Sequence, residues 1–229
     1  MGIEFTNEFW SAIAGAVVGG GIAFAVQMCA LLENRKQKES DRLLVDQGIA
    51  NSLMFKLCRL HADFERLRAH IEDSLQRKVP GGHHNEPWSS VRPWANLPIG
   101  ITFSSEEMGL LLKLKEDDLF NSIFSLDAVH SALIDILGQL KTERQKLFEK
   151  MPSRVIGTAL VQISLSKEEA EPLRIQMDSV NQLVLTAYEW CQRDAKTALD
   201  AIEKLQTALR DKLSWSFEFK LISAGHGNT

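Results

Sequence analysis

The longest charge-free stretch of the sequence, residues 9–32, restricts most strongly what the chain can fold into. It contains 24 residues, and Gln27 is the only strongly polar one among them. A helix rises about 1.5 Å per residue, so about 20 apolar residues are enough to cross the hydrocarbon core of a bilayer. The alternative is a buried core helix of a soluble protein, which rarely stays free of charge over such a length. We therefore predict a transmembrane helix over residues 9–32.

The charges on either side of this segment predict its orientation. Glu4 and Glu8 precede it without any Lys or Arg, which also differs from the basic start of a signal peptide. Three bases follow the segment, namely Arg35, Lys36 and Lys38. Cytoplasmic flanks carry an excess of Lys and Arg, so we expect residues 1–8 outside and residues 33–229 in the cytoplasm. The expected location is the cell inner membrane, which the chain crosses once.

One face of the predicted transmembrane helix consists mainly of small residues. These residues recur at every fourth position: Ser11, Gly15, Gly19, Ala23 and Gln27. Side chains four positions apart lie above one another on a helix, so the five form one stripe. Small residues let two helices approach closely in lipid, and a hydrogen bond between Gln side chains adds about 1 kcal/mol. We expect a homo-oligomer that associates through this stripe.

The remainder of the chain has the composition of an all-α protein. Four of the six prolines fall within residues 79–103, and the segments on either side are rich in Leu, Ala, Glu, Lys and Gln. Proline and glycine interrupt helices, whereas the flanking residue types favour them. We predict a cytoplasmic bundle of three long helices and one short helix, antiparallel, with coiled-coil-like seams. Residues 79–103 form a loop in this prediction.

Apolar residues mark the side of each long helix that should face the core. In the first helix, expected to continue to about Lys78, they alternate at spacings of three and four, which is typical of a coiled-coil seam. The seam residues are Leu53, Leu57, Leu60, Phe64, Leu67 and Ile71. Charged residues between them, Asp63 included, are expected on a solvated face.

Capping signals and prolines predict the other helix boundaries. Ser104 and Glu107 have the spacing of a capping box at the start of a short helix that ends near Lys115. A long helix should follow over residues 117–151, with His130 and Arg144 at two positions of its seam. Another should cover residues 166–213, with a later start or a kink at Pro172. Residues 155–165 and 215–222 are compatible with either strand or helix.

The search for reactive groups yields weak candidates. His83 and His84 lie in a loop, and adjacent residues on an extended chain point in opposite directions, so the pair alone makes no metal site. Acidic pairs occur where helices begin, where they complement the helix dipole. No nucleotide-binding, hydrolase or zinc-protease motif is present. We therefore predict no catalytic residue, no metal site and no cofactor.

The spacing Arg77-x5-His83 is similar to the Arg-x(4–6)-His motif of HEPN-type ribonucleases, which are also helical bundles. The resemblance covers this one short motif. In that family the motif lies at or near a helix N-terminus facing a dimer partner, whereas here it crosses a predicted helix end and a Pro-Gly-Gly break. The resemblance implies Arg77 and His83 as residues of an RNA-cleaving site.

These features favour a non-catalytic membrane protein. We expect its transmembrane stripe to bring copies together and its cytoplasmic bundle to bind a protein partner. The first alternative is a membrane effector, such as a toxin or defence protein, that oligomerises and permeabilises the bilayer. The HEPN-like ribonuclease is the second. The formal net charge of −4 argues against a dedicated nucleic-acid binder, which would carry a basic excess.

Overall fold

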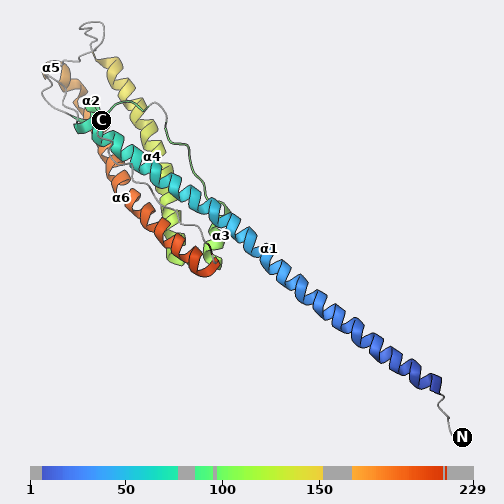
Figure 1. Cartoon of the computed structure of the whole chain (residues 1–229). Coiled ribbons are helices and arrows are strands. Elements are labelled where there is room, and N and C mark those ends of the chain that lie inside the picture. The colour runs from blue at the N-terminus through green and yellow to red at the C-terminus, as the bar shows by residue number, and fades with distance from the viewer. Residues whose placement is uncertain (1–6, 77–85, 95–96, 152–166, 214, 216–229) are drawn as a thin grey trace, which may run out of the picture. The chain divides into compact units, whose positions relative to one another are not determined.

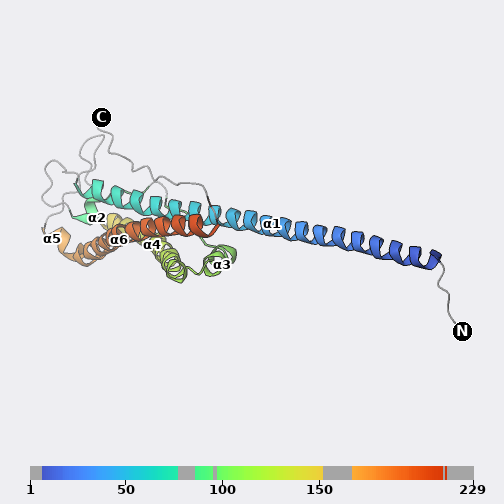
Figure 2. The same cartoon turned by 60° about the horizontal axis from the view of Figure 1, so that its bottom comes forward.

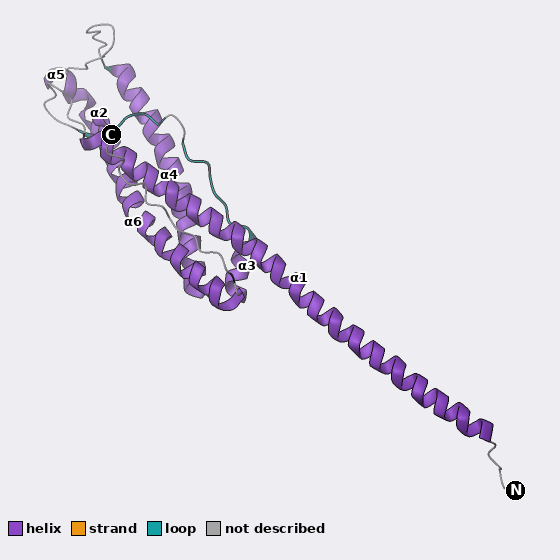
Figure 3. Ribbon diagram, in the orientation of Figure 1, coloured by secondary structure: helices purple, strands orange, loops and turns teal. Residues whose placement is uncertain are grey.

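All the regular secondary structure in the described part of the chain is helical. The computed structural model describes residues 7–76, 86–94, 97–151, 167–213 and 215. Within these ranges no strand occurs (Figure 3). The elements are α1 (Asn7–Gln76), α2 (Pro87–Ser90), α3 (Ser105–Lys113), α4 (Asp117–Lys150), α5 (Lys167–Ala170), the 3-10 turn η1 (Glu171–Leu173) and α6 (Arg174–Leu213). The predicted all-α class is confirmed for these residues.

The chain divides into two compact units, Met1–Gly48 and Ile49–Thr229. Helix α1 contributes residues to both units. In the first unit, the described side chains are those of Gly20, Gly21, Phe24 and the residues from Val26 onward. The second unit contains all the other helices, and its core defines the bundle.

Three helices build the core of the second unit: the part of α1 after Gly48, α4 and α6. Figures 1 and 2 show these three segments side by side in both views. The apolar residues that the sequence places on the seam of α1 are buried, and Phe64 has no exposed surface. The buried residues of α4 and α6 belong to the same apolar cluster. Burial of this shared stripe is the main source of stability for such helices.

The directions of the helices differ in part from the prediction. Lys212, at the end of α6, binds the carbonyl of Leu114 and the carboxylate of Glu116 just before α4 begins. Lys150, at the end of α4, binds Gln176 near the start of α6. Helices α4 and α6 are therefore antiparallel, as expected.

Helices α1 and α4 run in the same direction, so the antiparallel prediction is wrong for this pair. His130 of α4 faces Asp63 midway along α1. Further along both helices, His70 and Arg144 bind the carbonyl groups of two adjacent residues, Arg92 and Val91. The physical reason is the long connection between the helices, which carries α3 and returns the chain to the end of the bundle where α4 begins.

Helix α3 is fixed to α1 by its own N-terminal cap. The predicted capping box is confirmed, with Ser104 Oγ accepting from the backbone N–H of Glu107 and Glu107 Oε2 accepting from that of Ser104. The same carboxylate accepts hydrogen bonds from Lys56 Nζ at 2.7 Å and Ser52 Oγ at 2.6 Å. One side chain therefore caps α3 and attaches it to α1.

The start of the last helix shows how the chain accommodates Pro172. This residue lies in the 3-10 turn η1, between α5 and α6, so the predicted later start or kink of the last helix at Pro172 is confirmed. Proline lacks the N–H that a continuous α-helix would require at this position. The ambiguous segment 155–165 lies outside the described residues, as does all of 215–222 except the buried Trp215.

Candidate functional site

The described part of the predicted transmembrane segment has no protein cover. Every described side chain from Gly20 to Val45 is exposed, and the exposed fractions of Phe24, Val26 and Leu31 are 66%, 64% and 56%. Gln27, at the end of the predicted stripe, is exposed as well. The side chains of the other stripe residues lie outside the described part of the chain: Ser11, Gly15, Gly19 and Ala23.

The bases expected to set orientation lie on the continuation of the same helix. Arg35, Lys36 and Lys38 are all exposed and lie on helical backbone directly after the apolar run. Their amino and guanidinium groups are therefore free to contact water or lipid headgroups. These positions are compatible with the basic flank that is predicted to follow the transmembrane segment.

Among the described residues, one helix is long and apolar enough to cross a membrane by length and composition, and this helix is α4. Its most apolar window has a mean hydropathy of 1.3 and is 33% buried. A core helix of a soluble bundle satisfies the same criteria. Helix α4 has eight buried residues that pack in the bundle core, so we interpret it as a core helix.

The α1–α4 contact contains a buried polar pair. Asp63 is 8% exposed, so its expected place on a solvated face is wrong. Its Oδ2 lies 3.5 Å from Nε2 of the fully buried His130, and the His130 ring packs edge-on against Phe64 at 5.8 Å between ring centres. Neither His130 nitrogen has a hydrogen-bond partner among the described residues. The pair joins two core helices, and the His130 ring has no exposed surface.

The described residues offer little support for a metal site or a reactive thiol. No group of three His, Cys, Asp or Glu side chains with metal-binding geometry occurs in the described ranges. Burial and the nearby carboxylates of Asp194 and Glu65 raise the pKa of the Cys191 thiol to about 12. A thiol with such a pKa stays protonated at neutral pH, and only the thiolate is a good nucleophile.

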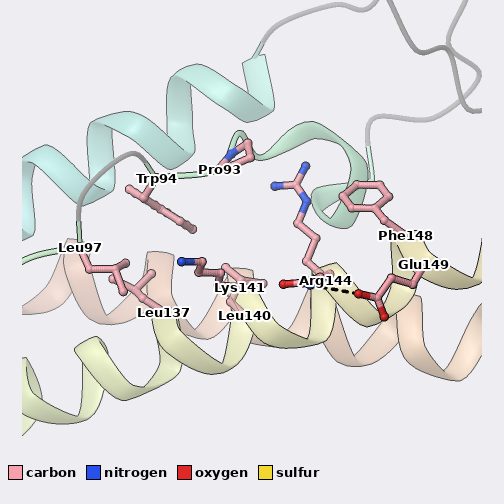
Figure 4. Close-up of a pocket in the computed structure, with 10 residues that line it drawn as sticks. Pro93, Trp94, Leu97, Leu137, Leu140, Lys141, Arg144, Phe148 and Glu149 are labelled. Atoms are coloured by element: carbon pink, nitrogen blue, oxygen red, sulfur yellow. Dashed lines mark hydrogen bonds between the residues drawn. The ribbon is translucent and has the colours of Figure 1, made fainter.

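A concave site of the bundle lies between α4 and the loop that follows α2. The cavity measures about 530 Å³ and is lined by Pro93, Trp94, Leu97, Leu137, Leu140, Lys141, Arg144, Gln145, Phe148 and Glu149. Figure 4 shows Trp94 and Leu97 entering from the loop and Arg144 and Phe148 rising from α4. The sequence did not predict this site.

Arg144 is the central polar residue of this cavity. Its Nη1 donates to the carbonyl of Val91, and its guanidinium lies over the Phe148 ring at 5.2 Å. Burial lowers the pKa of Arg144 from its ordinary value, but an arginine remains charged because that ordinary value lies far above neutrality. The sequence held two separate signals for this site: a charged residue at a seam position of the long helix, and a loop rich in tryptophan and proline.

The remaining candidates from the sequence, Arg77, His83 and His84, lie outside the described residues. The structure therefore leaves the resemblance to HEPN-type ribonucleases untested. Comparison of the chain with protein-family models, curated proteins and solved structures found no match.

Proposed function

We propose that this protein is a single-pass membrane-anchored assembly protein, with residues 9–32 of α1 as its anchor and the helical bundle as a cytoplasmic module that binds a protein partner. The observation that carries the proposal is the exposure of the described apolar side chains at residues 24–32 of α1. Apolar side chains on all sides of a helix, without charges between them, are stable in hydrocarbon and unfavourable in water.

The length of the apolar run supports a complete crossing. At about 1.5 Å per residue, the 24 residues from 9 to 32 extend about 36 Å as a helix, against about 30 Å for the hydrocarbon core. The surplus can be absorbed by a modest tilt. The bases at positions 35, 36 and 38 then lie just beyond the hydrocarbon, on the side proposed as cytoplasmic.

Fractionation of the full-length chain tests the anchor and its orientation. We expect the protein to stay in the membrane pellet after an alkaline carbonate wash. A reporter that is active only in the cytoplasm should be active when fused to the C-terminus. Recovery of the intact chain in the soluble fraction would contradict the anchor, and reporter activity restricted to the outside would contradict the orientation.

Self-association through the small-residue stripe requires a separate test. Leu at Gly15 and Gly19 would place two large side chains on the proposed contact face, so we expect cross-linked oligomers in mild detergent to decrease. Gly21 is a matched control, because it lies about 200° around the helix from Gly19 and a Cβ there meets nothing within 4 Å. Equal oligomer yields from G15L/G19L, G21L and the parent chain would contradict this interface.

Gln27 supports membrane permeabilisation as a second candidate, because it is an exposed polar side chain within an exposed apolar run. In an oligomer, a ring of such side chains could line a polar path. Under this proposal, high expression depolarises the membrane, and Gln27→Leu abolishes the effect while leaving the amount of membrane-bound protein unchanged. A normal membrane potential at high expression would exclude this candidate.

A further inference from the structure

We propose that the cavity between α4 and the loop residues Pro93, Trp94 and Leu97 binds a small carboxylic acid with an apolar body. The site belongs entirely to the second unit. The inference goes beyond the proposed anchoring function and does not depend on it.

The size and lining of the cavity are those of a ligand site. Its volume of about 530 Å³ lies within the usual range for small-molecule pockets, roughly 300–1,000 Å³. Leu97, Leu137, Leu140 and the Trp94 ring supply apolar surface on several sides. Figure 4 shows these side chains grouped on the side of the opening away from Phe148. An apolar body placed there would remove from water its own surface and the exposed parts of Trp94 and Leu97.

Two of the side chains that line the cavity carry a buried donor without an acceptor among the described residues. Arg144 uses Nη1 on the carbonyl of Val91, whereas its buried Nε has no hydrogen-bond partner among the described residues. The indole Nε1 of Trp94 is likewise buried without an acceptor in the described part of the chain. Buried donors without acceptors carry a free-energy penalty, because they have lost their hydrogen bonds to water. A ligand that supplies acceptor oxygens would remove it.

The geometry of Arg144 favours a carboxylate. With Nη1 engaged, Nε and Nη2 form the remaining planar edge of the guanidinium, and the two parallel N–H groups of such an edge match two carboxylate oxygens. The Phe148 ring packs against the guanidinium and restricts its orientation. Arg144 is thus held by two contacts that leave its carboxylate-binding edge unused.

The charge balance favours a monoanion. The lining includes two cations, Lys141 and Arg144, and one carboxylate, Glu149, which accepts a hydrogen bond from Gln145 at 3.0 Å. The site therefore carries a net charge of about one positive unit near neutral pH. A single carboxylate neutralises it, whereas a phosphate dianion would leave excess negative charge beside Glu149. An uncharged ligand would leave Arg144 partly buried and unpaired.

A carboxylic acid with an apolar body could be either a free cytoplasmic acid or a fatty acid released from lipid. The two sources share the chemistry of the site and differ in the shape of the apolar part. We use 2-naphthoate as a probe for a compact aromatic acid and decanoate for a flexible chain. Whichever probe binds more tightly identifies the source.

Calorimetric titration of the full-length protein in lipid nanodiscs tests the proposal, with empty nanodiscs as the blank for partition into lipid. We expect at least one acid to bind about tenfold more tightly than its neutral amide, 2-naphthamide or decanamide, as one favourable charge interaction of about 1.4 kcal/mol would give. Equal binding of acid and amide, or no binding of either acid above the blank, would overturn the proposal.

Two variants locate the binding to this cavity. Lys141 is exposed, so Lys141→Glu should leave the fold intact and weaken acid binding about tenfold by reversing one charge. Lys146→Glu is its matched control, because Lys146 is exposed on the same helix and does not line the cavity. Arg144→Gln should remove the preference for acid over amide. Equal weakening by K141E and K146E would overturn the assignment to this site, even if R144Q failed to fold.

Discussion

The side chains of helix α1 differ in exposure before and after Gly48. Before Gly48, every described side chain from Gly20 to Val45 is exposed, whether apolar or charged. After it, the exposed and buried positions alternate with the period of a packed helix, and Leu53, Leu57 and Leu60 have no exposed surface. The division of the chain into two units falls between Gly48 and Ile49.

The difference follows from the distribution of apolar residues around the helix. After Gly48, most of the large apolar side chains lie on one stripe, which is buried in the core of the bundle. The run at residues 9–32 is apolar on all sides and needs an apolar surrounding on all sides. We infer that the two parts of α1 are stabilised by different surroundings, packed protein in one case and lipid in the other. The following predictions test that comparison.

The largest effect is expected from the core of the second unit. Phe64→Ala removes a fully buried ring and should lower the free energy of unfolding by about 4 kcal/mol, through lost burial and the cavity left behind. Phe55→Ala is the control, since Phe55 lies on the same helix and is 66% exposed. Chemical denaturation followed by circular dichroism measures both. Similar losses from the two variants would contradict a core restricted to one face of α1.

A charge in the apolar run should affect membrane insertion rather than folding. Gly21→Arg meets no steric obstacle, and an arginine near the middle of a membrane span opposes insertion by about 3 kcal/mol. We expect less protein in the carbonate-washed membrane pellet. Ser40→Arg, on the exposed part of α1 after the run, should leave the pellet fraction unchanged. Equal membrane fractions for both variants would indicate that residues 9–32 do not cross the bilayer.

A smaller effect is expected where α3 joins α1. Glu107→Gln weakens the contacts to Lys56 and Ser52 and should destabilise the bundle by about 2 kcal/mol. Glu106→Gln is the control, because the Glu106 side chain lies in the same first turn of α3 and is exposed. Denaturant titrations that gave the two variants the same midpoint would contradict the role of Glu107 as an attachment.

The same carboxylate predicts a pH dependence. Burial by itself would raise the pKa of Glu107, but hydrogen bonds from Lys56, Ser52 and the Ser104 N–H outweigh it and hold this pKa below its ordinary value. A carboxyl with a lowered pKa stabilises the folded state above its unfolded pKa of about 4.3. That contribution is lost as the pH falls through the folded pKa. The parent chain should therefore lose more stability in acid than E107Q, and parallel pH profiles would contradict this.

The smallest expected effect compares two helical glycines. Gly138→Ala, within α4, should stabilise the bundle by up to about 1 kcal/mol, because alanine is the better helix former and its Cβ meets no neighbour there. Gly48→Ala offers the same open space at the boundary between the units. We expect a smaller change in bundle unfolding from G48A, since the preceding turns are not packed. An equal or larger gain at Gly48 would indicate that the bundle extends further towards the N-terminus.

Much of the bundle could be predicted because its signals are local. The seam of α1, the capping box at Ser104 and the irregular start at Pro172 each depend on residues within a turn or two of one another. Asp63 was predicted on the solvated face because it lies next to the seam. Which of the positions next to a seam are buried depends on the helix that packs against it. That helix contributes His130, whose sequence position is 67 residues away.

The sequence by itself determined the all-helical character of the described residues, the faces of the long helices and the apolar run on which the proposed anchor rests, because spacing and composition act within a single helix. The tertiary structure alone decided that α1 and α4 run in the same direction, that Glu107 joins α3 to α1, and that Trp94 and Arg144 border one cavity. These features depend on which segments meet in space, and a long connection between helices leaves that choice to the packing of the whole bundle.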